Sequence, residues 1–290
     1  MHIRHRLLTS IGLGIACAVL LAASVPGAPA EDYAKSFPVA GRAEVRVETN
    51  DGSVRVFTAD VKQVEFRVEY KGYELGKDLR IDSRQDGDNV ELVARVADHF
   101  GLSGLFRSRT LRIEVRMPRQ ADLRIETGDG SVKSEALEGK IDIRTGDGGI
   151  AVEGLKGDIR LHTGDGSIEA RDLDGRLDAH SGDGHVTLAG RFDDLQVKTS
   201  DGHIEARLGP GSKMASPWSI QTGDGGIDLR VPDGFQADLD ASSGDGRITL
   251  DIPLTVAGRV SRSKVHGQLN GGGPALILRS GDGSIRIERF

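Results

Sequence analysis

The chain has 290 residues, a formal net charge of −6 and 40 glycines, and only 4% of its residues are aromatic. This acidic balance argues against a nucleic-acid partner, which attracts basic surfaces. Glycine at about twice its usual share, together with few aromatic side chains, indicates many turns, small buried side chains and little helix. The single cysteine, Cys17, excludes an internal disulfide framework.

Residues 1–30 have the pattern of a secretory signal peptide. A basic start, MHIRHR, is followed by the apolar run LLTSIGLGIACAVLLAASV and by small residues at Ala28 and Ala30. We therefore expect cleavage after Ala30 and export, which leaves no stable transmembrane segment. The removed segment holds two of the 38 basic residues and none of the 44 acidic ones, so the mature chain has a net charge of −8 and no cysteine. Two alternatives remain, a lipoprotein anchored through Cys17 and an uncleaved N-terminal anchor.

Residues 35–122 show strand patterns without a fixed period and are expected to form irregular N-terminal coils. The stretch TNDGSV is followed by VKQVEFRVEY and NVELVARV, in which aliphatic and polar residues alternate as in a strand with one buried face. The loop 97–110 interrupts this pattern, and its apolar side chains are Phe100, Leu102, Leu105 and Phe106. We expect this loop either to cover the apolar end or side of the fold, or to contact a partner or a membrane surface.

Residues 123–208 repeat with a period of 18. An acidic turn recurs as TGDGSV, TGDGGI, TGDGSI, SGDGHV and TSDGHI, and its aspartates are Asp129, Asp147, Asp165, Asp183 and Asp201. Aliphatic residues alternate with polar ones before and after each turn, and a second corner such as LEGK or LKGD follows, which predicts two strands per repeat. A β-solenoid needs a fixed repeat length, because equivalent residues must stack in register, whereas an antiparallel meander of Asp-Gly hairpins does not. We therefore predict an all-β, right-handed parallel β-solenoid with 18-residue coils, and the meander is the alternative.

The period loosens in residues 209–290. The turn aspartates after Asp201 are 23, 21 and 37 residues apart, and the insertion LGPGSKMASPWSI places Trp218 in a predicted loop. Insertions in a solenoid emerge as surface loops, and terminal repeats depart from the consensus because they cover an otherwise open apolar end. We therefore expect C-terminal coils with insertions, within a single domain from residue 31 to residue 290.

Three stretches carry a family resemblance. They are LRIEVRMPRQADLRIETGDGSV, the serial GDG-aliphatic repeats, and the closing VHGQLNGGGPALILRSGDGSIRIERF. In this order, from about Ala43 to Arg289, they resemble the bacterial putative-adhesin domain of unknown function, a glycine-rich envelope family similar to the head GIN domains. The resemblance implies a β-solenoid fold and a location in the cell envelope. It implies no established activity and supplies no catalytic residue.

The repeated GDG turn has three candidate roles. A phosphate loop needs a helix after the turn, whereas a strand pattern follows every copy here. A calcium-binding β-roll also uses 18 residues per coil, but through two nonapeptides of the form GGxGxDxUx, and this chain has one GDG per coil. We interpret the turn as a structural corner in which each aspartate accepts hydrogen bonds from the amides of its own turn. Calcium bound along the stacked aspartates is the alternative.

Histidines recur at the same period. His162 and His180 are 18 residues apart, as are His185 and His203, so a solenoid would stack each pair. His180, Asp183 and His185 flank one corner and form a candidate zinc or copper site. The alternative is that they are solvated surface side chains, because both histidines fall at positions predicted to face the solvent.

These patterns nominate no catalytic residue and no cofactor. We predict a non-enzymatic scaffold or adhesin-like binding surface that is exported to the periplasm or cell envelope, or secreted. Its partner would be an envelope protein, a peptide or a glycan. Two other function classes stay open: a calcium-binding repeat protein, and a polysaccharide-active β-helix enzyme, which would need carboxylates in a groove with aromatic walls.

Overall fold

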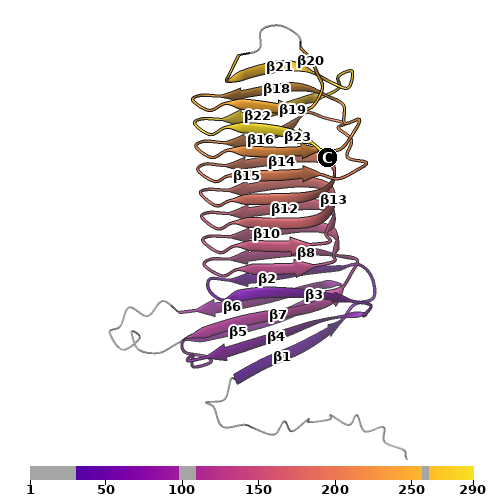
Figure 1. Cartoon of the computed structure of the whole chain (residues 1–290). Coiled ribbons are helices and arrows are strands. Elements are labelled where there is room, and N and C mark those ends of the chain that lie inside the picture. Colours follow the sequence, from indigo (N-terminus) through magenta and orange to yellow (C-terminus); the bar gives the residue numbers. More distant parts are fainter. Residues whose placement is uncertain (1–30, 98–108, 257–260) are drawn as a thin grey trace, which may run out of the picture.

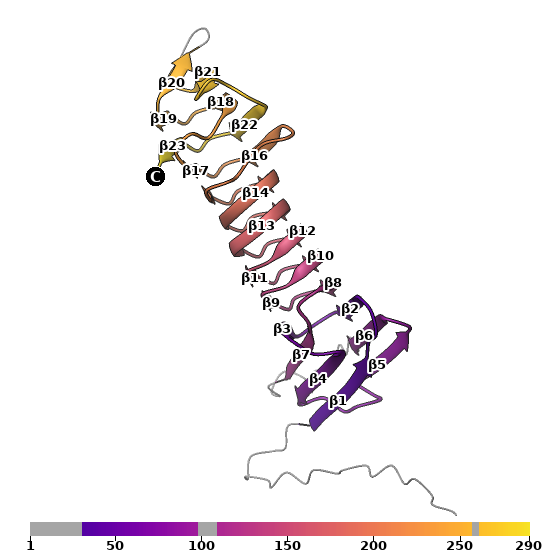
Figure 2. The ribbon, with the colours of Figure 1, turned by 90° about the vertical axis from the view of Figure 1, so that its right-hand side faces the viewer.

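The computed structural model describes residues 31–97, 109–256 and 261–290. In these residues the chain forms strands and no helix, which confirms the predicted all-β class. It follows that the described part of the chain contains no helix long and apolar enough to cross a membrane. The strands stack into an elongated body with two facing rows of strands (Figures 1 and 2).

The strands fall into three groups along the chain. The N-terminal group consists of β1 (Glu31–Pro38), β2 (Ala43–Thr49), β3 (Ser53–Ala59), β4 (Gln63–Lys71), β5 (Leu79–Asp86), β6 (Asn89–Val96) and β7 (Thr110–Pro118). The repeat group consists of β8 (Ala121–Thr127), β9 (Val132–Glu135), β10 (Glu138–Thr145), β11 (Ile150–Glu153), β12 (Lys156–Thr163), β13 (Ile168–Ser181), β14 (Val186–Thr199) and β15 (Ile204–Leu208). The C-terminal group consists of β16 (Trp218–Thr222), β17 (Ile227–Val231), β18 (Ala237–Ser243), β19 (Ile248–Asp251), β20 (Leu254–Val256), β21 (Lys264–Leu269), β22 (Ala275–Ser280) and β23 (Ile285–Arg289).

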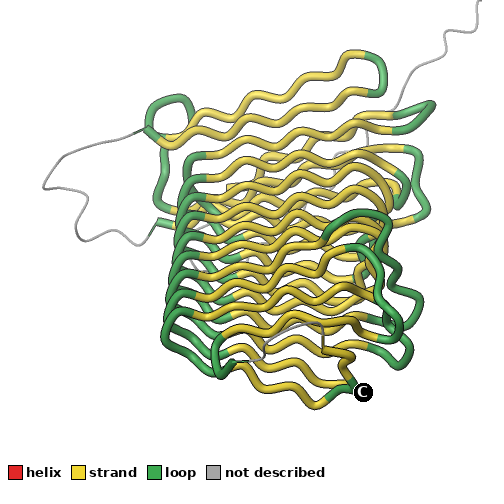
Figure 3. The backbone as a smooth tube through the Cα atoms, turned by 90° about the horizontal axis from the view of Figure 1, so that it is seen from above, coloured by secondary structure: helices red, strands yellow, loops and turns green. Residues whose placement is uncertain are grey.

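Strands of neighbouring repeats pair in parallel and in register. In the row that contains β8, β10 and β12, called row A, Ile141 lies opposite Leu123 on one side and Ile159 on the other. In the facing row B, which contains β9 and β11, Ile150 lies opposite Ile168. Each partner is 18 residues away, so equivalent side chains form columns along the stack, about 4.8 Å apart. The repeats are therefore not arranged as an antiparallel meander, and seen from above their turns gather at two edges (Figure 3).

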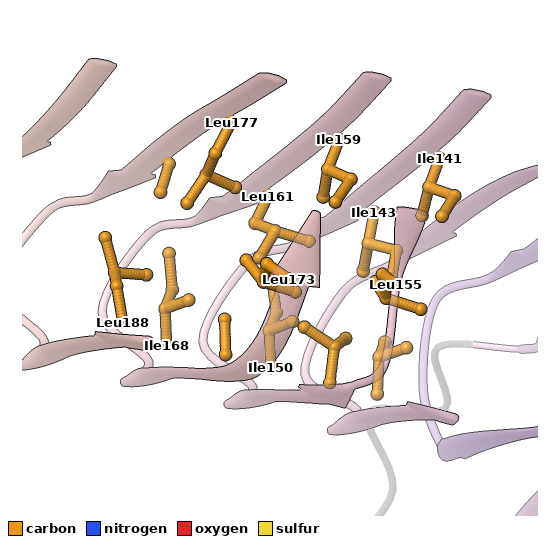
Figure 4. Packing of buried hydrophobic residues seen from close by; sticks show 14 of the residues in the cluster. Ile141, Ile143, Ile150, Leu155, Ile159, Leu161, Ile168, Leu173, Leu177 and Leu188 are labelled. Carbon is orange, nitrogen blue, oxygen red and sulfur yellow. The ribbon is translucent and has the colours of Figure 1, made fainter. Parts of the chain in front are cut away.

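The space between the two rows is filled by aliphatic side chains. Ile141 and Ile143 point inward from row A and Ile150 points inward from row B (Figure 4), and each has at most 1% of its surface exposed. Burial of one such side chain contributes about 1.5–3 kcal/mol to folding. A further buried column lies at the second corner, where the sequence predicted only turns, and consists of Leu137, Leu155 and Leu173. The core is thus closed at this corner by leucines as well as along both rows.

At both ends of the stack the repeats lie out of chain order. Strands β2 and β3 pair in parallel with β8 and β9 on one side, and with β6 and β7 on the other. Strands β22 and β23, the last of the chain, pair in parallel with β16 and β17 on one side, and with β18 and β19 on the other (Figure 1). The first and the last repeats of the sequence are therefore both interior repeats in space. The sequence pattern did not predict this exchange of order.

Antiparallel strands complete the two ends, so the sheet is mixed. At the N-terminal end β4 pairs with β7, β1 pairs with β4, and β5 pairs with β6. At the C-terminal end β21 pairs with both β18 and β20. Trp218 corrects the loop expectation, because it begins β16 opposite Leu276, is fully buried, and has its ring 5.7 Å from that of Phe235. The predicted contact residues Phe100, Leu102, Leu105 and Phe106 lie outside the described residues.

Candidate functional site

A buried hydroxyl side chain precedes most of the repeated corners. The set consists of Thr49, Thr127, Thr145, Thr163, Ser181, Thr199, Thr222, Ser243 and Ser280. At Thr163, Oγ1 accepts a hydrogen bond from the Gly166 amide of its own corner at 3.1 Å and donates one to the Gly148 carbonyl of the previous corner at 2.9 Å. Thr145 and Ser181 make the same two bonds. We name these side chains the hydroxyl column. Thr222 and Ser243 also make such a bond pair, which closes one turn and ties it to a neighbouring repeat. Thr127 differs, because its Oγ1 has no hydrogen-bond partner among the described residues.

The second glycine of each corner is required by the close approach of neighbouring repeats. An ideal Cβ on Gly166 would lie 2.1 Å from the carbonyl oxygen of Gly148, and one on Gly184 would lie 2.0 Å from that of Gly166. No side chain fits at such distances without separating the two backbones. The hydroxyl column and this glycine together explain why the corner is repeated.

The corner aspartates are exposed at the outer edge of the stack. They are Asp129, Asp147, Asp165, Asp183 and Asp201. Within the described residues no hydrogen bond or ion pair holds any of these five carboxylates, so the expectation that they satisfy their own turn amides is wrong. At the corners of Asp147, Asp165 and Asp183 the hydroxyl column accepts the amide hydrogen bond instead. Asp51 of the first corner differs, because it accepts hydrogen bonds from the Gly52 amide at 2.6 Å and the Tyr73 hydroxyl at 3.2 Å. Burial and the charge of Asp51 raise the pKa of Tyr73 to about 12.

Four outward-facing side chains of row A form a column that we name the basic ladder. From one repeat to the next they are Arg144, His162, His180 and Lys198. The rings of His162 and His180 are stacked, with their centroids 4.9 Å apart and their planes 7° from parallel. Burial, and then the positive charges of His162 and Lys198, lower the pKa of His180, while Asp178 opposes this shift.

The other two periodic histidines lie at the start of row B. The His203 amide donates a hydrogen bond to Nδ1 of His185 at 3.1 Å, and Nε2 of His203 lies 3.2 Å from a carboxylate oxygen of Asp228. His185 thus contacts its equivalent in the next repeat, whereas His203 contacts Asp228. Among the described residues no group of three His, Cys, Asp or Glu side chains is placed to hold a metal ion, so His180, Asp183 and His185 are not brought together as a site.

Comparison with known families agrees with this architecture. The model of the Toastrack DUF4097 family matches residues 44–288, nearly the whole described chain. The chain belongs to this family. Toastrack DUF4097 is a family of unknown function, and its match supports a β-solenoid-like fold. No curated protein matches the chain significantly.

Solved structures from species of Parabacteroides and Bacteroides match the chain at low sequence identity. A putative lipid binding protein from Parabacteroides distasonis has 14% sequence identity and a TM-score of 0.49, with 88% of this chain and 96% of that chain covered. A putative adhesin from Parabacteroides merdae has 10% identity and a TM-score of 0.47, with 89% and 96% covered. A putative adhesin from Bacteroides fragilis has 11% identity and a TM-score of 0.44, with 89% and 97% covered. These values are low, and family membership rests on the family model alone.

The outer faces of this Toastrack chain carry ion pairs that link neighbouring repeats. Arg230 lies 3.3 Å from Glu205 on one side and 3.6 Å from Glu288 on the other. The guanidinium of Arg191 contacts Asp174 of the previous repeat at 2.5 Å and Asp193 of its own strand at 2.6 Å, and its hydrogen bonds to Asp193 lower the pKa of that carboxyl. Exposed pairs of this kind contribute at most about 1 kcal/mol each. They therefore order the surface charges more than they stabilise the stack.

Proposed function

We propose that the protein is an exported, non-enzymatic binding scaffold of the cell envelope, acting as an adhesin-like surface for an envelope protein, a peptide or a glycan. The observation that supports the proposal is that inward-facing and outward-facing residues of each repeat have different roles. The hydroxyl column and the corner glycines are used inside the stack, whereas the outward columns, such as the basic ladder, present charged side chains at a fixed spacing. In this proposal, residues 31–290 form one domain that winds as a right-handed solenoid with 18-residue coils.

Three features suit such a surface. Parallel pairing in register fixes the distance between equivalent side chains, so a partner meets a preformed array and little ordering entropy is lost on binding. The mixed strands at both ends cover the core, which leaves the two rows as the main faces of the body. The mature chain has no cysteine, so this array would not depend on the redox state of the compartment.

Export and binding are tested separately. N-terminal sequencing of the protein recovered from fractionated cells is expected to begin at Glu31, and removal of residues 1–30 is expected to retain the protein in the cytoplasm. The purified mature chain is then incubated with envelope fragments and with an array of immobilised glycans and peptides, and retention is measured. Recovery of the full-length chain in the cytoplasmic fraction, or depolymerisation of any glycan on the array, would contradict the proposal.

The calcium-binding alternative rests on the five exposed corner carboxylates, which no side chain or amide of the described residues engages. Melting of the purified mature chain is compared in the presence of excess EDTA and of millimolar calcium. The structural-corner interpretation predicts equal melting temperatures, because the hydroxyl column closes the turns without a cation. A rise of several degrees with calcium, absent when Asp165 and Asp183 are replaced by Asn, would favour the calcium-binding protein.

A further inference from the structure

The basic ladder contains the only stacked pair of imidazoles among the described residues, and this pair lies between two permanent cations. Arg144 on β10 precedes the pair, and Lys198 on β14 follows it. Over three repeat intervals of about 4.8 Å, the ladder places four basic groups in a straight row about 14 Å long. The row runs along the stack, across the direction of the strands.

Several charged groups face the two histidines. Two residues earlier on the same strands, the neighbouring column consists of Asp142, Arg160, Asp178 and Gln196. Asp142 is held 3.1 Å from the guanidinium of Arg144. Three residues after each histidine comes an exposed corner aspartate, Asp165 or Asp183. The next repeat continues the ladder with the neutral Gln221 on β16.

Protonation changes the charge of this patch in a defined way. With both histidines neutral, the three cations and two aspartates of the two columns leave a net charge of +1. Protonation of His162 and His180 raises it to +3, and histidine is the side chain whose charge changes between about pH 5 and pH 8. The two rings are stacked, so protonation of both rings brings two like charges to about 5 Å from each other. This repulsion disfavours the doubly protonated state unless a bound anion covers the solvent-facing side of the pair.

We propose that the basic ladder is a proton-gated binding row for a linear polyanion, a polymer that carries a carboxylate or a phosphate on each unit. This inference rests on the proposed role as a binding surface and names the chemical class of its ligand. A polymer lying along the stack would meet one basic group per repeat, so its charges are neutralised by side chains whose spacing the sheet already fixes. The corner aspartates would repel the polymer and confine it to row A.

Protonation of the two histidines and binding of the polymer are coupled, so the histidine pKa values provide a second measurable quantity. An anion that binds the charged ladder must raise the pKa of the two imidazoles, because binding and protonation favour the same state. The same linkage requires that affinity increases as the pH falls through the histidine range. Each additional exposed ion pair strengthens binding up to about fivefold, so two protonated histidines strengthen it by about 2- to 30-fold.

The experiment measures the affinity of the purified mature chain for polygalacturonate and for polyphosphate by isothermal titration, at pH 5.5 and pH 7.5 and constant ionic strength. We expect binding about 2- to 30-fold tighter at pH 5.5 for at least one of the two polymers, and the polymer that binds identifies the anionic group. The His162→Gln/His180→Gln variant should lose this pH dependence. The matched control, His185→Gln/His203→Gln on row B, should keep it, because those histidines lie outside the ladder.

Two further measurements complete the test. An Asp165→Asn/Asp183→Asn variant should bind more tightly at both pH values, because the repelling charges are removed. NMR titration of the imidazole C–H signals should show the pKa of His162 and His180 rising when the polymer is present, and circular dichroism checks that each variant is folded. Absence of tighter binding at pH 5.5 in the wild-type chain, or equal pH dependence in the two double histidine variants, overturns the proposal. Either result would leave export and the binding of other partners untouched, since fractionation and the array test those.

Discussion

The hydroxyl column can be tested at Thr163, which is fully buried and hydrogen-bonds the Gly166 amide and the Gly148 carbonyl, with a longer bond of 3.3 Å to the Gly146 carbonyl. Thr163→Val keeps the shape of the side chain and removes all of these bonds. The substitution leaves the Gly166 amide and the Gly148 carbonyl oxygen without these partners, in a part of the corner that excludes water. Thr163→Ser is the matched control, since it keeps the hydroxyl and places at this corner the residue that the next corner already has, Ser181.

The expected magnitudes separate the two variants. A buried polar group left without its hydrogen bond costs about 1–3 kcal/mol, so the two groups orphaned by Thr163→Val should lower the free energy of unfolding by about 2–6 kcal/mol. Thr163→Ser loses one buried methyl group, which costs about 1 kcal/mol. Asp165→Asn should change the free energy of unfolding by no more than about 0.5 kcal/mol, because this exposed carboxylate takes no part in closing the turn.

Urea unfolding followed by circular dichroism measures these differences, and amide hydrogen exchange at Gly166 reports on the corner itself. Both measurements are needed, because a stack of repeats can lose its ends before its centre and so depart from a single transition. The Val variant should unfold at lower urea and exchange the Gly166 amide faster than the Ser variant. If the two variants unfold at the same urea concentration, or if Asp165→Asn costs as much as Thr163→Val, the hydroxyl column does not hold the corner and this reasoning fails.

Three further predictions probe the same framework. Gly166→Ala would place a Cβ 2.1 Å from a backbone oxygen and should sharply lower the urea midpoint, whereas Gly149→Ser, whose Cβ meets its nearest atom at 3.4 Å, should be tolerated; equal midpoints would contradict the close-approach argument. Ala136 has a φ of 47° where the next repeat has Gly154, so Ala136→Gly should raise the free energy of unfolding by about 0.5–1 kcal/mol, and a decrease would refute this. Because the folded state lowers the pKa of His180, the unfolded chain binds that proton more readily; stability should therefore fall as the pH drops below 6.5, and His180→Gln should flatten this dependence in urea titrations from pH 7.5 to pH 5.

The interior of the repeats could be predicted from the sequence because one regularity determines it. A fixed spacing of 18 residues assigns Leu123, Ile141 and Ile159 to one column, and the structure pairs them in that register. The partner of the turn amide could not be read from the same pattern. Thr163 and Asp165 are both able to accept that hydrogen bond, and only the burial of the strand end decides for the hydroxyl.

The order of the strands at the two ends of the stack could not be predicted from the sequence, for a different reason. A repeat period indicates which residues are equivalent. Which repeats lie side by side also depends on whether the segment that connects them is long enough to pass over another repeat. The segments between β3 and β8, and between β19 and β22, are long enough, and they contain the hairpin strands that make the detour. Trp218 was misplaced because glycine and proline before it indicated a loop, whereas its partner Leu276 lies far along the chain.

The last repeat of the sequence lies inside the stack, and this position determines the order in which the chain can fold. During synthesis the chain emerges from its N-terminus, so β16 to β19 are made while the strands that must separate them are still to come. Until β22 and β23 arrive, two open strand edges face each other with complementary hydrogen-bonding groups, and each can pair with the wrong neighbour. A chain that stops short of residue 275 would thus be left with an internal gap and two unsatisfied edges. Completion of the C-terminal end is therefore a late event, and truncated chains should be the ones that aggregate or are degraded.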